Sequence, residues 1–253
     1  MDKNDYIFGL RAVIEAIEAG KDIDKVLIRK DLQGGELLSE LLDTLRRNNV
    51  VSQRVPLEKI NKITRKNHQG VVAMLSAVTY HSLENLVPQI YEDGLMPFMV
   101  LLDGITDVRN FGAIARTAEC VGADAIVIPE RGSVGVGGDA VKTSAGALLH
   151  LPVCRYRNIF SAVRFLKDNG YKIVAASEKS EINYTTADYT GPVAIVMGAE
   201  QTGISPEVLR QCDTIVSIPQ FGHIGSLNVS VAAGVMMYEV VRQRLAAGLT
   251  AND

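Results

Sequence analysis

The sequence contains no tryptophan, only four histidines and only three cysteines among its 253 residues. Cys120, Cys154 and Cys212 stand far apart, which argues against a disulfide framework and against a zinc-binding cysteine pair. No two histidines have the spacing of metal ligands, so we expect no metal site. The phosphate-binding pattern G-x-x-x-x-G-K-[ST] and the hydrolase pattern G-x-S-x-G are also missing, which excludes two common classes of enzyme.

Long apolar runs are missing as well. No stretch without charge reaches the roughly 18 residues that a membrane-spanning helix needs. Asp2, Lys3 and Asp5 precede any apolar run, so no secretory signal peptide is expected. We therefore expect a protein of the cytoplasm with no membrane partner.

Charge is nearly balanced, with a net charge of −3, which argues against a protein that coats nucleic acid without selectivity. The balance is uneven along the chain, because residues 1–80 carry 13 Lys and Arg against 11 Asp and Glu. The stretch KINKITRKNHQG (59–70) holds four basic residues and no acidic one. This stretch is either a local basic patch for a polyanion or an ordinary solvated helix face.

One glycine-rich stretch imitates a dinucleotide site. GVGGDA (135–140) fits the relaxed pattern G-x-G-x-x-A, but it does not turn directly out of the preceding strand DAIVIPE, as a true fingerprint would. No acidic residue follows at the expected distance, where Arg155, Tyr156 and Arg157 stand instead. The hypothesis of a nicotinamide-dependent oxidoreductase therefore depends on these glycines alone.

The pattern of apolar residues predicts an α/β protein with two domains. Residues 1–80 form a small α/β domain, residues 81–97 a linker with a short helix, and residues 98–253 a larger domain in which helices and strands alternate. Near-continuous apolar strands such as PFMVLL and PVAIVM are typical of a parallel sheet covered on both faces. The larger domain is expected to have strands at 98–103, 124–128, 152–156, 171–176, 192–197 and 213–218, and helices at 110–121, 138–149, 158–169, 205–211 and 226–245.

Three stretches with polar residues inside apolar runs begin where strands end, which is where parallel sheets bind ligands. In FGAIARTAECVGADAIVI (111–128), Arg116 lies opposite the apolar face of a predicted helix. Asn110 stands at or near the N-cap, beside free backbone N–H groups. Together they could receive a phosphate or a polarised hydroxyl, although Arg116 could equally face solvent and pair with Glu119.

The other two stretches strengthen this interpretation. SLNVSVAAGVMMYEV begins a helix, with Ser226 as the expected N-cap and with Asn228 and Ser230 among apolar neighbours. Buried amides and hydroxyls imply hydrogen-bond partners. MGAEQTG turns from an apolar strand through Gly198, and glycine lets backbone approach a ligand closely. Each stretch alone could be an ordinary turn or cap, but their combination predicts one site.

These motifs resemble those of a known family. DVRNFGAIARTAECVGADAIVIP, VMGAEQTGIS and SIPQFGHIGSLNVSVAAGVMMYEVVRQR are similar, in order and spacing, to the three motifs of the SpoU family of RNA ribose 2′-O-methyltransferases, in the SPOUT superfamily. FGLRAVIEAI and NHQGVVAML are similar to the ribosomal-protein-like substrate-binding domain that precedes the catalytic domain in enzymes that modify a guanosine of large-subunit ribosomal RNA. The third motif departs from the family at Gln220, where methionine is usual.

The resemblance implies an S-adenosylmethionine-dependent enzyme that acts as a homodimer and has a C-terminal trefoil knot. It assigns activation of the ribose 2′-hydroxyl to Arg116, assisted by Asn110, Ser226 and Asn228, and a role in holding the site together to Glu200. It places the cofactor against Gly198, Ile218 and Leu227. Recognition of structured RNA would fall to the first domain, with contacts from Arg11, Lys62, Arg65, Lys66, His68 and Gln69.

Two other functions stay open. A ribose methyltransferase that acts on tRNA would carry the same three motifs. The alternative from another class is a catalytically silent RNA-binding protein of ribosome assembly, and the intact polar set at positions 110, 116, 226 and 228 argues against it.

Overall fold

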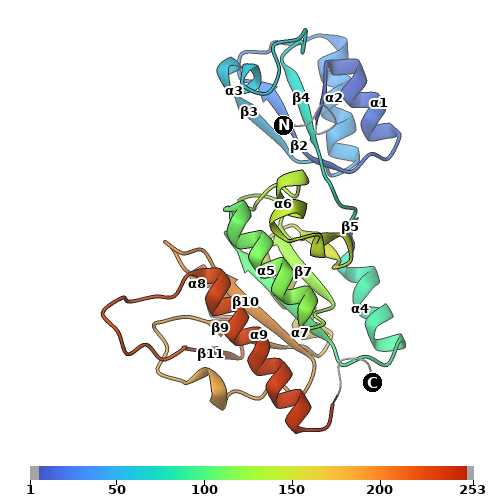
Figure 1. The fold of residues 1–253 in the computed structure, drawn as a ribbon. Helices are drawn as coiled ribbons and strands as arrows, with labels where there is room; N and C mark the ends of the chain where they lie inside the picture. Colours follow the sequence, from blue (N-terminus) through green and yellow to red (C-terminus); the bar gives the residue numbers. More distant parts are fainter. Residues whose placement is uncertain (1–5, 250–253) are drawn as a thin grey trace. The chain divides into compact units, whose positions relative to one another are not determined.

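A computed structural model describes residues 6–249, and this part of the chain forms two compact units. The first unit comprises the chain up to Thr79 together with Gly135–Asp139, and the second comprises Tyr80–Val134 and the chain from Ala140 onwards. Each unit has its own sheet (Figure 1). No helix in the described part of the chain is long and apolar enough to cross a membrane.

The first unit has a four-stranded mixed sheet in the order β1-β4-β2-β3. Strands β1 and β2 both run antiparallel to β4, and β2 runs parallel to β3. Its elements are β1 (Tyr6–Phe8), α1 (Leu10–Glu18), β2 (Ile23–Arg29), α2 (Glu36–Arg47), β3 (Ser52–Val55), α3 (Leu57–Asn61) and β4 (Val71–Leu75).

Alternation along the strands gives this sheet two apolar faces. One face packs on α1 and α2, through residues such as Val13 and Leu41, and the other packs on α3 through Ile60. Phe8 belongs to β1 and α1 begins at Leu10, because Gly9 between them has a φ of 91° and turns the chain there.

The second unit has a seven-stranded, all-parallel sheet in the order β11-β9-β10-β6-β7-β8-β5, which confirms the predicted α/β fold. Its elements are β5 (Tyr80–His81), α4 (Leu83–Glu92), β6 (Phe98–Asp103), α5 (Val108–Cys120), β7 (Ala125–Pro129), α6 (Gly138–Thr143, which begins in the segment assigned to the first unit), η1 (Ala147–Leu149), β8 (Val153–Tyr156), α7 (Ile159–Asp168), β9 (Lys172–Ala176), η2 (Tyr184–Thr186), β10 (Val193–Gly198), α8 (Pro206–Leu209), β11 (Thr214–Val216) and α9 (Val229–Ala246).

Helices cover both faces of this sheet. Helices α4 and α7 pack on one face of the sheet. Helices α5 and α9 pack against each other and run side by side in Figure 1. On α5, Phe111, Ile114 and Ala118 are fully buried, as the apolar stripe predicted. Burial of a phenylalanine or isoleucine side chain contributes about 1.5–3 kcal/mol to folding.

Residues 81–97, which the sequence analysis assigns to a linker, contain β5 in part and all of α4. Leu83, Val87 and Ile90 of α4 are buried in the core of the second unit. Pro88 and the neighbouring polar residues weaken the apolar period of this short helix, so its packing face is hard to recognise in the sequence.

Two further helices differ from the expectation. The predicted helix 138–149 is interrupted after Thr143, because Ala145 and Gly146 have φ values of 52° and 90°. Helix α9 begins at Val229 rather than at residue 226. The trefoil knot implied by the resemblance stays a prediction.

Candidate active site

The site lies at the carboxyl ends of β6 and β10, two neighbouring central strands. Chain order runs from β6 through β7 and β8 toward one edge, while β10 and β9 lie on the other side of β6. Ligands of open parallel sheets bind at such a reversal point. Asp103 ends β6 and pairs in register with Gly198, which ends β10. The first and second polar stretches therefore start side by side.

A tight turn follows β10. The Gly203 N–H donates to the Ala199 carbonyl at 2.8 Å, and Gly203 has a φ of 66°. A Cβ on Gly198 would lie 2.3 Å from the Gly203 carbonyl carbon, so glycine is needed there for one backbone segment to pass another. The Asp103 carboxylate accepts from the Ser205 N–H at 2.7 Å and ties the turn to the end of β6.

Three polar side chains from distant parts of the sequence meet beside this turn. Asn228 Nδ2 donates to Glu200 Oε1 at 2.6 Å and to Asn110 Oδ1 at 3.0 Å. Asn110 Nδ2 donates to the same Glu200 oxygen at 3.2 Å. Asn110, Glu200 and Asn228, which we call the polar triad, thus hold one another, and hydrogen bonds to a carboxylate are stronger than those between neutral groups.

The two asparagines of the polar triad are positioned by helix starts. Asp107, not Asn110, is the N-cap of α5, and its Oδ1 accepts from the backbone N–H groups of Arg109 and Asn110 at 2.9 Å. Asn228, not Ser226, is the N-cap of α9, and its side chain accepts from the Ser230 N–H at 2.9 Å. A cap fixes its side chain against the first turn, so Asn228 serves its helix and the polar triad at once.

A cavity of about 300 Å³ opens next to the turn. We call it the donor cavity, because it is lined by the residues predicted to hold the methyl donor. Gly198, Ile218 and Leu227, the three residues predicted to hold a cofactor, all line it, and so do Glu200, Gln220 and Ser226. Its other lining residues are Ala176, Ser177, Glu178, Lys179, Met197, Ala199, Gln201, Thr202, Gly203, Ile204, Leu209, Gly225, Val229 and Ala232.

A second cavity of about 310 Å³ lies beside the first turn of α5. We call it the acceptor cavity, because Asn110, predicted to assist activation of the methyl-accepting hydroxyl, lines it. Asn110 and Glu200 line it. Its other lining residues are Gly104, Ile105, Thr106, Asp107, Ala199, Gln201, Thr202 and Val229. Residues 199–202 and Val229 therefore line both cavities and separate them.

Comparison with known proteins explains the arrangement. The model of the SpoU rRNA Methylase family matches residues 97–238, and that for RNA 2′-O ribose methyltransferase substrate binding matches residues 6–81. The chain belongs to the SpoU rRNA methylase family. It is thus an RNA ribose 2′-O-methyltransferase, as the three motifs predicted. A putative TrmH family tRNA/rRNA methyltransferase of Staphylococcus saprophyticus is 39% identical over 238 residues, which cover 94% of this chain and 95% of that protein.

Solved structures of SpoU-type enzymes have the same fold. An AdoMet-bound rRNA methyltransferase from Sinorhizobium meliloti is 28% identical, with a TM-score of 0.60 over 94% of this chain and 87% of its own. The SpoU methyltransferase AviRb from Streptomyces viridochromogenes, in complex with AdoMet, is 25% identical, with a TM-score of 0.60 over 95% and 90%. A TrmH/SpoU tRNA modifying enzyme from A. aeolicus is 29% identical, with a TM-score of 0.55 over 66% and 86%.

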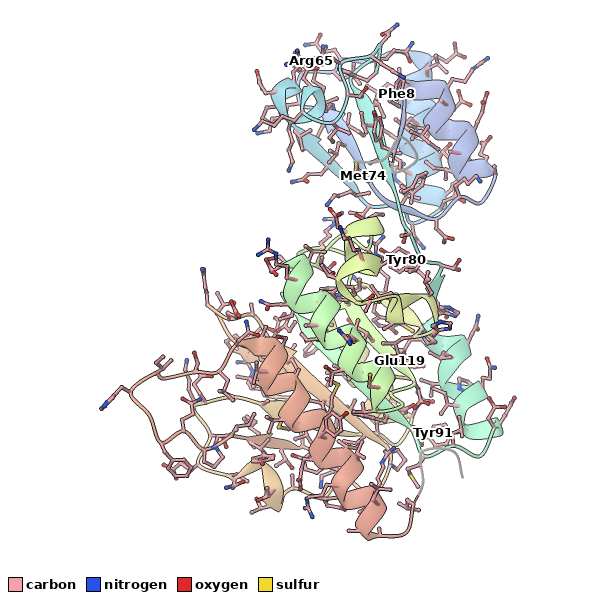
Figure 2. The ribbon with its side chains drawn as sticks, in the orientation of Figure 1. Phe8, Arg65, Met74, Tyr80, Tyr91 and Glu119 are labelled. Atoms are coloured by element: carbon pink, nitrogen blue, oxygen red, sulfur yellow. The ribbon has the colours of Figure 1, made fainter. Side chains whose placement is uncertain are left out.

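Arg116 of the first SpoU motif stands apart from the polar triad. Its side chain is exposed on α5, and no hydrogen bond or ion pair joins it to any described residue. In particular it forms no ion pair with Glu119, whose position on α5 is labelled in Figure 2. Gly112, one turn before Arg116, packs on Thr143, whose side chain would overlap a Cβ at position 112.

Ser226 of the third motif is exposed and lines the donor cavity without a hydrogen bond to the polar triad. It lies in the segment 219–228, where all residues are exposed and Phe221 is 98% exposed. Asn228 was expected to be buried and is exposed, so the polar triad is open to solvent in a single chain.

In the first unit, the predicted RNA contacts fall into two groups. Arg11, Lys62, Arg65 and Lys66 are exposed, with Arg65 on the loop after α3 (Figure 2). His68 and Gln69 are engaged within the fold. The His68 Nδ1 accepts from the Gly70 N–H at 2.9 Å, its Nε2 lies 3.1 Å from Asn61 Oδ1, and the Gln69 Oε1 accepts from the Leu10 N–H at 3.0 Å.

Sequence reasoning missed Asp103 and Asp107 as parts of the site. Asp103 ends an apolar strand and Asp107 precedes a helical stripe, and acidic residues at these two kinds of position commonly anchor loops and cap helices. A systematic search for such residues would have identified both.

Proposed function

We propose that this enzyme transfers the methyl group of S-adenosylmethionine to the 2′-hydroxyl of a guanosine in large-subunit ribosomal RNA, in the cytoplasm. The observation that supports it most is the meeting of Asn110, Glu200 and Asn228, one from each SpoU motif, at Glu200, which lines two cavities of the size that small ligands occupy. The preference for ribosomal RNA and for guanosine rests on the resemblance of residues 1–80 to the domain of those enzymes.

The donor cavity fits the cofactor chemically. Met197, Ile204 and Leu209 offer apolar contact for the adenosine rings, and Ile218 and Leu227 also line the cavity. S-adenosylmethionine carries a positively charged sulfonium and an ammonium group beside one carboxylate. Glu178 and Glu200 provide negative charges for the two cationic groups, and Lys179 provides a positive charge for the carboxylate.

The residues of the site would act mainly by orientation and electrostatics. The bound cofactor supplies a methyl group that is activated by its positive sulfur. Transfer of this methyl group to the 2′-oxygen would leave S-adenosylhomocysteine as the second product and release the hydroxyl proton to solvent. Asn110, held by Glu200 and Asn228, can hydrogen-bond and aim the ribose. Correct alignment of reactants contributes roughly 7–11 kcal/mol in favourable cases.

Arg116 would stabilise negative charge that develops on the 2′-oxygen. A guanidinium is a poor base because it does not lose its proton in proteins, but it is an effective electrostatic stabiliser. Since Arg116 does not contact the polar triad of its own chain, we propose that it acts in the site of a second copy.

The surface around α9 supports such a homodimer. Val231, Tyr238 and Leu245, spaced seven residues apart, are 52%, 56% and 61% exposed. Residues at this spacing share one helix face. Gly234 on this face packs near Thr117 of α5, the residue next to Arg116. A second copy that covered this apolar stripe would therefore also meet the region of Arg116.

The first unit would select the RNA. Lys62, Arg65 and Lys66 would contact phosphates, and such contacts give salt-dependent affinity. Folded RNA would be recognised by its shape and its 2′-hydroxyls. His68 and Gln69 would hold the loop and the start of α1 that present these residues, rather than contact RNA through their bonded atoms.

Ribose-methylation mapping on total RNA tests this proposal. RNA from source cells with and without the protein would be compared nucleotide by nucleotide. We expect one 2′-O-methylguanosine of the large-subunit RNA to depend on the protein. A dependent site in tRNA instead would identify a tRNA enzyme, and no dependent site, together with no binding of S-adenosylmethionine, would indicate a silent RNA-binding protein.

A further inference from the structure

Between the donor and acceptor cavities lies a wall formed by residues 199–202 and Val229. The wall is fixed at its base by the Gly203 N–H bond to the Ala199 carbonyl and by the Asp103 bond to the Ser205 N–H. Glu200 in this wall is held by the two asparagines of the polar triad. Ligands held in the two cavities would therefore meet at residues 200–202.

Two exposed side chains of this wall, Thr202 and Gln201, make no hydrogen bond with a described residue, and the longer of them is Gln201. It lines both cavities. Its amide can donate two hydrogen bonds and accept two. Thr106, which lines the acceptor cavity but not the donor cavity, is likewise exposed without a bonded partner among the described residues.

The charges of the acceptor cavity indicate which part of a nucleotide it takes. No lysine or arginine lines it, whereas Asp107 and Glu200 do. Two carboxylates repel a phosphate and favour neutral groups with N–H or O–H donors. The donors of a nucleotide are its base edge and its ribose hydroxyls. A base that is paired in a duplex cannot enter a concave site, so such a nucleotide must be unstacked.

We propose that the acceptor cavity holds the base and ribose of one unpaired nucleotide, with its phosphates outside, and that Gln201 and Thr106 determine which base is accepted. This inference rests on the proposed function, because it presumes that RNA is the methyl acceptor. It adds a specificity role for two residues that lie outside the polar triad.

The test compares Gln201→Leu, which removes the hydrogen-bonding amide at similar volume, with Gln211→Leu, the same change in a residue that lines neither cavity. The full-length proteins would methylate RNA isolated from source cells that lack this protein. Three quantities would be measured: S-adenosylmethionine affinity, KM for the RNA at several salt concentrations, and the proportions of the four 2′-O-methylnucleosides after digestion.

For Gln201→Leu we expect a KM for RNA raised about tenfold, the loss that one to two hydrogen bonds produce, and a broader set of methylated nucleosides. The dependence of RNA binding on salt should not change, because no phosphate contact is lost. Thr106→Val should broaden the products in the same way, and Gln211→Leu should match the unchanged protein.

Three outcomes would overturn the inference: unchanged KM and products, weaker S-adenosylmethionine binding with unchanged products, or a reduced salt dependence. Failure of the unchanged protein to methylate any RNA would instead refute the proposed function. Equal melting temperatures of the variants would show that a loss of KM is not a loss of folding.

Discussion

The polar triad and Arg116 belong to the same three-motif pattern, yet the structure treats them differently. Asn110, Glu200 and Asn228 are joined by three hydrogen bonds within one chain. Arg116 is exposed on α5 and has no such partner among the described residues. The difference teaches that one chain is enough to join the polar triad, whereas Arg116 is left free at the surface, as its proposed action in a second copy requires.

The largest effect should come from removing that charge. Arg116→Ala is expected to lower kcat by about 10²–10³-fold, the usual loss when one group that stabilises transition-state charge is deleted. S-adenosylmethionine affinity, measured by calorimetry, should be unchanged because Arg116 does not line the donor cavity. Arg210→Ala, an exposed arginine next to α8, serves as the control for the loss of a positive charge. Near-normal turnover by Arg116→Ala would remove Arg116 from the mechanism.

A smaller loss should follow from loosening the polar triad. Glu200→Ala leaves the Asn110 and Asn228 amides without their shared acceptor, and misplacement by about 1 Å can cost up to 10²-fold in rate. We expect a loss in kcat of about 10–10²-fold, with partial recovery in Glu200→Gln, which retains an acceptor oxygen. The exposed Glu207→Ala is the matched control. If Glu200→Ala and Glu207→Ala had equal rates, the polar triad would have no positioning role.

The smallest of the three effects should come from the first unit. The triple change Lys62→Ala, Arg65→Ala and Lys66→Ala should weaken RNA binding and reduce the slope of log affinity against log salt by about 2–3, close to one for each lost phosphate contact. A control triple at Lys21, Arg46 and Arg47, which are also exposed, removes the same charge elsewhere. Identical salt slopes for the two triples would show that binding depends on net charge and not on this patch.

The sequence predicted the layers of the fold better than their arrangement. Periodicity identifies β6 and β10 as buried strands, because both are apolar along their length. It cannot show that β10 lies between β6 and β9, since that order depends on contacts between residues far apart in the chain. The neighbouring ends of β6 and β10, on which the site depends, therefore come from the structure.

The candidate site was predictable where a motif fixed it and not where packing did. The motifs identified Asn110, Glu200 and Asn228, but helix-start rules chose Ser226 as the cap of α9. Both Ser226 and Asn228 are good capping residues. Asn228 is the cap because the chain stays non-helical up to that residue, and α9 begins at Val229.

Mixing two impaired variants tests most directly whether the site is completed by a second copy. Arg116→Ala and Asn228→Ala proteins would be unfolded together, refolded as a mixture and assayed for RNA methylation, with each variant refolded alone for comparison. If Arg116 acts on the polar triad of its partner, mixed dimers contain one intact site, and roughly a quarter of the wild-type sites should return. A mixture no more active than its separate components, although mixed dimers have formed, would contradict this account.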